Sequence, residues 1–236
     1  MCVYCKKNGM VMDSVLSATT ANNLFWLGRY VERGYLLLHL MRKAYDEVID
    51  VPVGERPYSE FLTRLNGYSC TEFTTSYQMM HQIYDAGVET SLRSVIERMM
   101  DNAIVLRPQI YSESFGYIEL CRDRIRVEAE RGQMNITDLQ PITDWLLAFW
   151  GSVSERLHGR VYYLLMIGRL VERLDVCLRF GYKRYRVLET WNSLVKYRDF
   201  CPDIYDEVQM VRVDELLHSE FDRNEVIAGL NCLIKV

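Results

Sequence analysis

Two stretches of the sequence carry one signature: Leu27-Gly28-Arg29-Tyr30-Val31-Glu32-Arg33 and Ile167-Gly168-Arg169-Leu170-Val171-Glu172-Arg173. Both fit the template apolar-Gly-Arg-x-Val-Glu-Arg, with five of seven positions identical. Arginine, glutamate and arginine at positions i, i+3 and i+4 share one face of a helix. Glycine inside a helix costs ~1 kcal/mol relative to alanine, so its presence indicates that another backbone approaches closely. The repeat therefore predicts two equivalent helices that meet at one site.

The surroundings of each copy favour a buried position. Around the first copy, apolar or small residues recur at 3,4 spacing: Leu24, Leu27, Val31, Gly34, Leu38, Met41, Tyr45 and Val48. This seam predicts a long helix, from about residue 19 to 50, that packs nearly antiparallel to its neighbours. Just before the second copy, residues 161–167 are apolar on every face of a helix, which is typical of a buried helix. Charged side chains there must be paired.

The charges of the two copies predict specific contacts. If the helices pack antiparallel with their motifs level, Glu32 meets Arg169 or Arg173, and Glu172 meets Arg29 or Arg33. Four arginines then face two glutamates, a surplus that Asp175 would reduce and that Arg93 or Arg107 would increase. Two interpretations stay open: an anion or an acidic partner group fills the site, or the network only fixes the register of the helices.

The sequence outside the two motifs also predicts helices. No window alternates apolar and polar residues as a half-buried strand does, so the sequence predicts an all-α helical bundle with long antiparallel helices and negligible β-sheet. After the first helix we expect helices at one or two places in 58–87, then near 90–106, 112–132, 137–185 (broken near Gly151 or Gly159), 187–199 and 203–222. We expect residues 1–14 to be a disordered extension, 15–185 the bundle, and 186–236 further helices packed on the same domain. The extension contains a lone Cys2-Val3-Tyr4-Cys5 pattern, which is half of a zinc site at most.

Composition excludes several classes of function. The net charge is −4 and no basic stripe is visible, so we expect no nucleic-acid partner. No segment reaches the ~18 apolar residues of a membrane span, and the first residues lack the charged and apolar regions of a signal peptide, so we expect neither. The seven scattered cysteines indicate reduced thiols and a cytoplasmic protein. No glycine-rich phosphate loop is present, so we do not expect the chain to bind ATP through one, and no nucleophile elbow indicates a catalytic triad. We expect no cofactor.

A di-metal site is a separate alternative. Glu155 precedes His158 by three residues, and Glu215 precedes His218 by three. Two such pairs with two more glutamates, nominally Glu32 and Glu97, make the di-metal site of ferritin-like bundles. The polar residues beside both pairs are typical of solvated faces and weigh against this interpretation.

Three blocks of the sequence resemble the alpha-E family, a predicted α-helical domain with a Glu-Arg motif. The block from Ala21 to Arg33 is similar to the family's opening block, with Asn22 in place of the usual glutamate. Residues 167–175 resemble its later block, with Leu174 in place of alanine. A third block is more weakly similar to the family, and it consists of Ser91-Leu92-Arg93 followed by Asp101-Asn102-Ala103 and Arg107. The resemblance covers about residues 16–185.

The resemblance implies a setting and a set of residues. Members of the family accompany circularly permuted ATP-grasp proteins and often transglutaminase-like proteins, which implies amide-bond or peptide ligation. Our leading hypothesis is an accessory or binding module for an ATP-grasp-type ligase or its peptide, without turnover of its own. The rival is an enzyme acting on a carboxylate- or phosphate-bearing peptide, since arginines suit both anions. The candidate binding residues are Arg29, Glu32, Arg33, Arg93, Asn102, Arg107, Arg169, Glu172, Arg173 and Asp175.

Overall fold

The computed structural model describes residues 16–47, 50–51, 58–66, 75–132, 135–219 and 222–235. The predicted extension at residues 1–14, with its cysteine pair, lies outside the described residues. Within them the chain is helical, and β pairing is limited to one isolated bridge between Tyr205 and Ile234. The prediction of an all-α fold is confirmed.

The α-helices are α1 (Ala18–Glu47), α2 (Ser59–Asn66), α3 (Thr75–Tyr84), α4 (Leu92–Val105), α5 (Ser112–Arg131), α6 (Gln140–Arg156), α7 (Gly159–Arg179), α8 (Arg184–Val195), α9 (Glu207–His218) and α10 (Arg223–Asn231). Short 3₁₀ helices cover Ile136–Leu139 (η2), Arg198–Phe200 (η3) and Pro202–Ile204 (η4). No helix among the described residues is long and apolar enough to cross a lipid bilayer.

Helix boundaries follow local chemistry, with some corrections to the predicted ranges. Gly132 ends α5 at a left-handed φ of 63°, as its sequence suggests. The helix predicted over 137–185 divides before Gly159, which has a φ of 62°. The helix predicted over 203–222 is shorter, because the Asp206 side chain caps α9 by accepting from the Gln209 N–H. Asp222 caps α10, a helix that the sequence reading missed.

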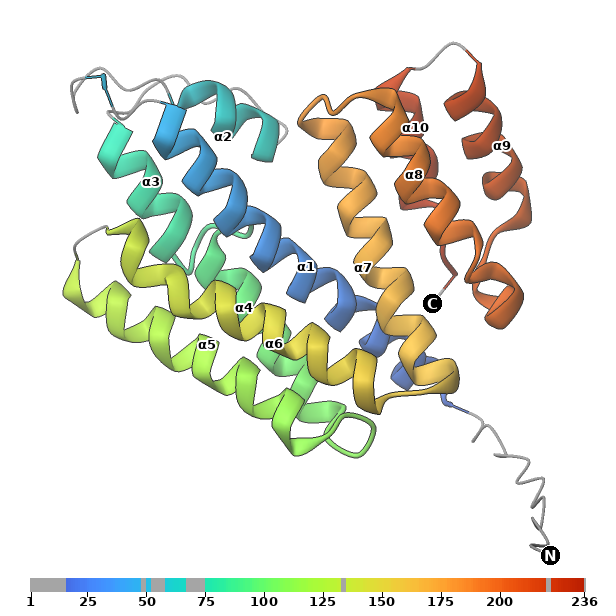
Figure 1. Cartoon of the computed structure of the whole chain (residues 1–236), viewed down its shortest axis with the longest axis horizontal. Helices are drawn as coiled ribbons and strands as arrows, with labels where there is room; N and C mark the ends of the chain where they lie inside the picture. The colour runs from blue at the N-terminus through green and yellow to red at the C-terminus, as the bar shows by residue number, and fades with distance from the viewer. Residues whose placement is uncertain are drawn as a thin grey trace, which may run out of the picture.

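Two long helices occupy the centre of the molecule and the others surround them. Figure 1 shows α1 and α7 side by side, with α5 and α6 along one side and α8, α9 and α10 on the other side of α7. The expected antiparallel packing is found in α5 and α6. Ser114 Oγ lies 2.9 Å from Ser152 Oγ, and Cys121 Sγ lies 3.9 Å from the carbonyl oxygen of Ile142. Residue numbers therefore rise along one helix as they fall along the other.

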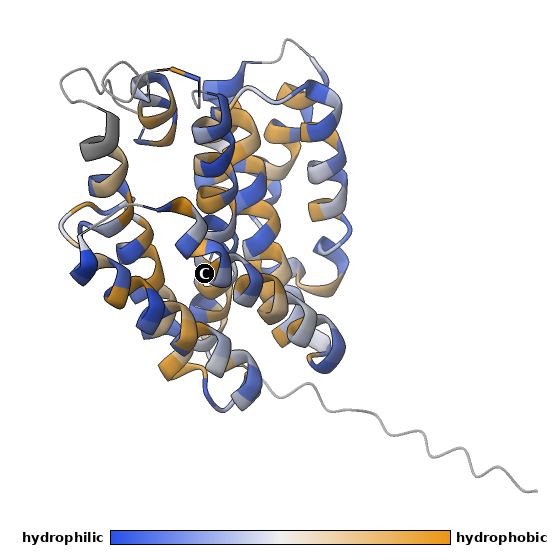
Figure 2. Ribbon diagram, turned by 60° about the vertical axis from the view of Figure 1, so that its left-hand side comes forward, coloured by the Kyte–Doolittle hydropathy of each residue, from blue (hydrophilic) through white to orange (hydrophobic). Residues whose placement is uncertain are grey.

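One buried apolar cluster extends from α1 to the C-terminal helices. It includes Leu24 and Val31 of the predicted seam in α1, together with Phe149 of α6 and Trp191 of α8. In Figure 2 the helices carry hydrophobic and hydrophilic residues along their length, as amphipathic helices around a shared core do. The last seam position, Val48, lies outside the described residues.

Candidate functional site

Two glycines bring α1 and α7 into direct backbone contact. A Cβ atom added to Gly28 would lie 2.2 Å from the carbonyl oxygen of Leu165. A Cβ atom added to Gly168 would lie 2.1 Å from the carbonyl oxygen of Phe25. Real Cβ atoms do not approach backbone oxygen so closely, so any other residue would push the helices apart. The close approach that the sequence predicted from these glycines is present.

The two signature helices run parallel, which corrects the antiparallel arrangement expected from the sequence. The backbone at Gly28 approaches Leu165 and Arg169, and the backbone at Gly168 approaches Phe25 and Arg29. The ion pairs lie further along both helices, and they join Arg29, Glu32 and Arg33 to residues 169–173. All of these contacting residues are 137 to 143 apart in sequence. A nearly constant sequence separation along the contact is typical of parallel helices. Figure 1 agrees, since the earlier residues of both α1 and α7 lie at the lower end of the molecule.

Glu172 of α7 is enclosed by the two arginines of the α1 motif. The Arg29 Nε–H donates to Glu172 Oε2 over 2.9 Å. Arg33 donates from Nε to Oε1 over 2.5 Å and from Nη2 to Oε2 over 2.9 Å, a bidentate pair. The Glu172 side chain is 2% exposed, and those of Arg29 and Arg33 are 11% and 26% exposed.

Glu32 of α1 is held in the same way from the other helix. Arg169 donates from Nε to Glu32 Oε2 over 3.0 Å. Arg173 donates from Nε and Nη2 to Glu32 Oε1, over 2.8 and 2.5 Å. Glu32 is fully buried, while Arg169 and Arg173 are 20% and 37% exposed. Each glutamate thus meets two arginines of the opposite helix, and each three-residue group retains one surplus positive charge.

Aromatic rings cover the guanidinium groups of the inner arginines. The Arg29 guanidinium carbon lies 4.9 Å from the centre of the Trp26 ring, and that of Arg169 lies 4.4 Å from the Trp150 ring. Cations over tryptophan faces are stabilised by the ring quadrupole. The sequence reading did not identify Trp150, which reaches the site from α6, because no spacing rule links it to the motif.

The carboxylate of Glu172 stays ionised despite its burial. Burial alone would raise its pKa, but the guanidinium groups of Arg33 and Arg29 outweigh burial and hold the pKa below the usual 4.5. For Arg33, burial opposes the charged form, but Glu172 more than compensates and raises the pKa of the guanidinium. Both partners therefore remain charged at neutral pH.

We expect this coupling to appear as acid sensitivity of the fold. Because the pKa of Glu172 is lower in the folded state than its unfolded value near 4.5, the unfolded chain takes up the proton first as pH falls. The stability that Glu172 contributes is thus complete above that value and is lost as the pH drops through the folded-state pKa. Unfolding free energies of the wild type and of Glu172→Gln, measured from about pH 7 to about pH 3, should converge below about pH 4.5. A difference that does not change with pH would contradict the expectation.

The remaining candidate residues are not hydrogen-bonded to these two groups. Asp175 is mostly buried and accepts from the Nε–H of Arg179 over 2.8 Å, one turn along α7. The Asn102 amide donates to the carbonyl oxygen of Arg98 within α4. The Arg107 guanidinium carbon stacks 4.2 Å from the centre of the Phe115 ring. Asp175 acts electrostatically on Arg33, but it does not neutralise the cluster by direct pairing.

The weakest of the three sequence blocks contributes no ligand-like group to the crossing. Among the described residues, no hydrogen bond or ion pair joins Arg93, Asn102 or Arg107 to the signature side chains. Arg93 Nε is buried and has no hydrogen-bond partner among the described residues. A different arginine of α4, Arg98, lines a cavity of about 260 Å³ beside Arg33 and Glu172. It is paired with Glu89 at 2.7 Å, and the sequence reading did not select it.

The di-metal alternative is wrong for the described part of the chain. All four side chains are exposed: Glu155 at the end of α6, His158 just before α7, and Glu215 and His218 on α9. No three histidine, cysteine, aspartate or glutamate side chains come together there as a metal site requires. Glu32, one of the nominal further ligands, is already bound to Arg169 and Arg173.

Comparison with known proteins identifies the family. Residues 16–218 match the model of a family described as a predicted alpha-helical domain with a conserved ER motif. The chain belongs to the Alpha-E family. The match extends through α8 and α9, beyond the range on which the sequence resemblance rests. Searches of curated proteins and of solved structures found no match.

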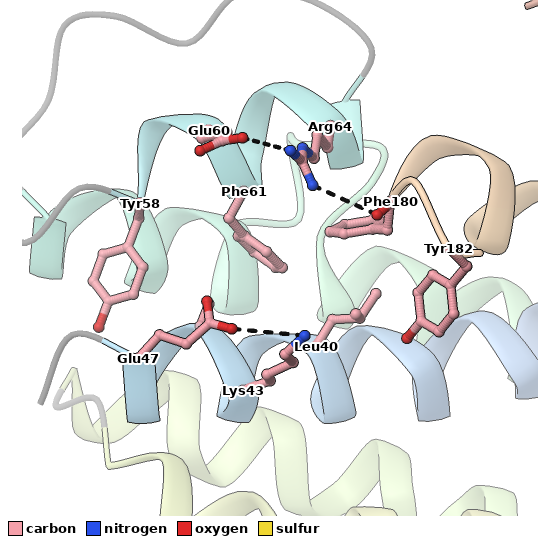
Figure 3. Close-up of a pocket in the computed structure, with 10 residues that line it drawn as sticks. Leu40, Lys43, Glu47, Tyr58, Glu60, Phe61, Arg64, Phe180 and Tyr182 are labelled. Carbon is pink, nitrogen blue, oxygen red and sulfur yellow. Dashed lines mark hydrogen bonds and ion pairs between the residues drawn. The ribbon is translucent and has the colours of Figure 1, made fainter. Parts of the chain in front are cut away.

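A further hollow of this Alpha-E chain lies between α1, α2 and the turn after α7. It has a volume of about 320 Å³, and Figure 3 shows Phe61, Phe180 and Tyr182 among the residues that line it. Its charges are balanced by local pairs: Lys43 with Glu47 at 3.6 Å, and Arg64 with Glu60 at 2.5 Å. This hollow therefore lacks the surplus positive charge of the signature cluster.

Proposed function

We propose that the protein is an accessory binding module of an ATP-grasp-linked amide or peptide ligation system. Its arginine–glutamate cluster contacts acidic groups of the ligase or of its peptide. The observation that carries the proposal is the charge of the helix crossing, where four arginines surround two buried glutamates. An excess of positive charge at a largely buried site is costly unless an acidic group approaches it.

The outer arginine of each motif supports this role through its geometry. Arg33 and Arg173 bind their glutamates with Nε and Nη2, and their Nη1 groups make no hydrogen bond to any described residue. Both side chains are partly exposed, at 26% and 37%. A fixed guanidinium with a free edge suits a carboxylate, because the orientation is set before the ligand arrives.

The type of partner rests on the family resemblance and on the chemistry of ligation. Amide ligation joins a carboxylate to an amine, so its substrates carry the group that arginines recognise. ATP-grasp proteins, and transglutaminase-like proteins with them, are the partners that the resemblance implies. A binding module with arginines at its surface would hold such a peptide or dock on an acidic surface of the ligase.

Co-purification from the source cell tests the proposal. The tagged wild-type chain should capture a circularly permuted ATP-grasp protein, and amide ligation should require both proteins. Because the contact is electrostatic, capture should weaken between about 0.05 M and about 0.5 M salt as the charges are screened. Turnover of a carboxylate-bearing peptide by the isolated chain would instead favour the rival enzyme hypothesis. Failure to capture an ATP-grasp protein at low salt would contradict the proposal.

A further inference from the structure

The Glu32 side of the helix crossing opens into a cleft between α1, α7 and α8. The cleft has a volume of about 340 Å³, and Arg173 of the signature lines it. The Glu172 side faces a smaller cavity of about 260 Å³. There the additional arginines already have carboxylate partners, since Arg98 binds Glu89 and Arg179 binds Asp175. The two sides of the crossing thus differ in what they offer a ligand.

Besides Arg173, which is bound to Glu32, the cleft contains an arginine without a carboxylate partner among the described residues. Arg186 of α8 lines it, and within the described chain its hydrogen bond goes to the hydroxyl of Tyr185 over 3.4 Å. No carboxylate of a described residue lies within ion-pair distance of Arg186. Both Arg186 and Arg173 act electrostatically on the thiol of Cys177 in the same cleft, so their charges reach one shared region.

Counting charges around the cleft leaves one positive charge unbalanced. Arg169, Arg173 and Arg186 carry positive charge, while Glu32 and the lining residue Glu189 carry negative charge. One carboxylate would balance this set, whereas a doubly charged phosphate would exceed it. The charge alone therefore favours a monovalent acid.

The rest of the cleft is apolar and aromatic. Leu36, Leu170 and Cys177 line it, and the latter two are each 8% exposed. On α1 the rings of Tyr35 and His39 stack nearly parallel, at 11° with centroids 6.4 Å apart, and both line the cleft. Such walls suit a hydrocarbon or ring next to the charged group, because ligand sites combine apolar surface with a few oriented polar groups.

We propose that this cleft binds a carboxylate that lies next to an apolar side chain, as at the end of a peptide. Arg186 and the free edge of Arg173 hold the carboxylate, and the side chain packs against Leu36, Leu170 and the Tyr35 ring. The inference rests on the proposed function, because it names the group that the binding module takes and the side of the crossing that takes it.

N-acetyl-leucine and its uncharged amide are suitable probes, used with the full-length protein and saturation-transfer difference NMR. The acid should bind the wild type, and the amide should bind at least about tenfold more weakly, since hydrogen bonds to charged groups contribute that much. Arg186→Ala should weaken binding of the acid by about tenfold. The substitution should not alter the fold, because Arg186 is exposed. The matched control is Arg126→Ala, an exposed arginine on α5 that pairs with Glu97 away from the cleft.

Several results would overturn the inference. Equal binding of the acid and the amide, an Arg186→Ala protein that binds the acid like the wild type, or inorganic phosphate that outcompetes the acid would each do so. The proposed function is tested separately by the capture of an ATP-grasp protein. If the chain captured an ATP-grasp protein but did not bind N-acetyl-leucine, the proposed carboxylate site alone would be rejected. If it bound N-acetyl-leucine but captured no ATP-grasp protein, the site would stand and the proposed partner would be rejected.

Discussion

Replacing Gly168 with alanine is expected to lower the free energy of unfolding by at least about 3 kcal/mol, at the upper end of what overpacking costs. The added Cβ would lie 2.1 Å from the carbonyl oxygen of Phe25 and 3.1 Å from the amide nitrogen of Arg29. These are backbone atoms of α1, which cannot rotate away as a side chain can. The helices must separate, and separation also lengthens the guanidinium–carboxylate contacts on both sides of the crossing.

Chemical denaturation followed by circular dichroism measures this loss, and Gly151→Ala is the matched control. Gly151 lies in α6, and a Cβ added there meets no atom within 4 Å. Alanine should therefore stabilise that helix by up to about 1 kcal/mol. If Gly168→Ala unfolded at the same denaturant concentration as the control, the close crossing would be wrong.

The reciprocal glycine provides a second, independent measurement. Gly28→Ala should be as damaging as Gly168→Ala, since its Cβ would lie 2.2 Å from the carbonyl oxygen of Leu165. The two losses should not add. Once one alanine has moved the helices apart, the second meets less obstruction, so the double variant should lose less than the sum. Simple additivity would show that the two glycines do not share one crossing.

Residue spacing accounts for the part of the site that the sequence predicted. The i, i+3, i+4 pattern places Arg29, Glu32 and Arg33 on one face, and the repeated glycine marks where that face meets its counterpart. The relative direction of the two helices could not be predicted from this pattern. Two identical motifs can pair reciprocally about a two-fold axis either along the helices or across them, and both arrangements join Glu32 to Arg169 and Arg173. The packing of the connecting helices, α2 to α6, decides between these two arrangements, and it cannot be predicted from the motif.

For a similar reason, the sequence did not predict which residues of other helices reach the site. Trp150 covers Arg169 from α6, and Arg186 enters the cleft from α8, yet neither belongs to a repeat. In α4 and the turn after it, the sequence favoured Arg93 and Arg107, whereas Arg98 of α4 lies beside the Glu172 side of the cluster. Which face of a helix turns toward a given site depends on tertiary packing, so a single charged residue in a helix cannot be assigned from spacing alone.

The second large effect is expected from Glu172→Gln, which should lower the free energy of unfolding by about 3 kcal/mol. Glutamine preserves the shape of the side chain but removes the charge that compensates Arg29 and Arg33. Arg29 is only 11% exposed and cannot be fully solvated in place. Thermal and denaturant unfolding measure the loss, with Glu113→Gln as the control. Glu113 pairs with Arg156 at 2.8 Å in an exposed position, so its loss should stay within about 1 kcal/mol.

Comparison with Glu32→Gln separates the burial of the carboxylate from the burial of its arginines. Glu32 is slightly more buried than Glu172, at 0% against 2% exposure, but its arginines are more open to water, at 20% and 37% against 11% and 26%. The penalty of breaking a buried ion pair comes from the charge left behind, and water reaches Arg169 and Arg173 more readily. Glu172→Gln should therefore destabilise the protein more than Glu32→Gln does. The reverse order would show that desolvation of the carboxylate governs the site, and a Glu172→Gln protein that melts like the wild type would show that the motif is a solvated face.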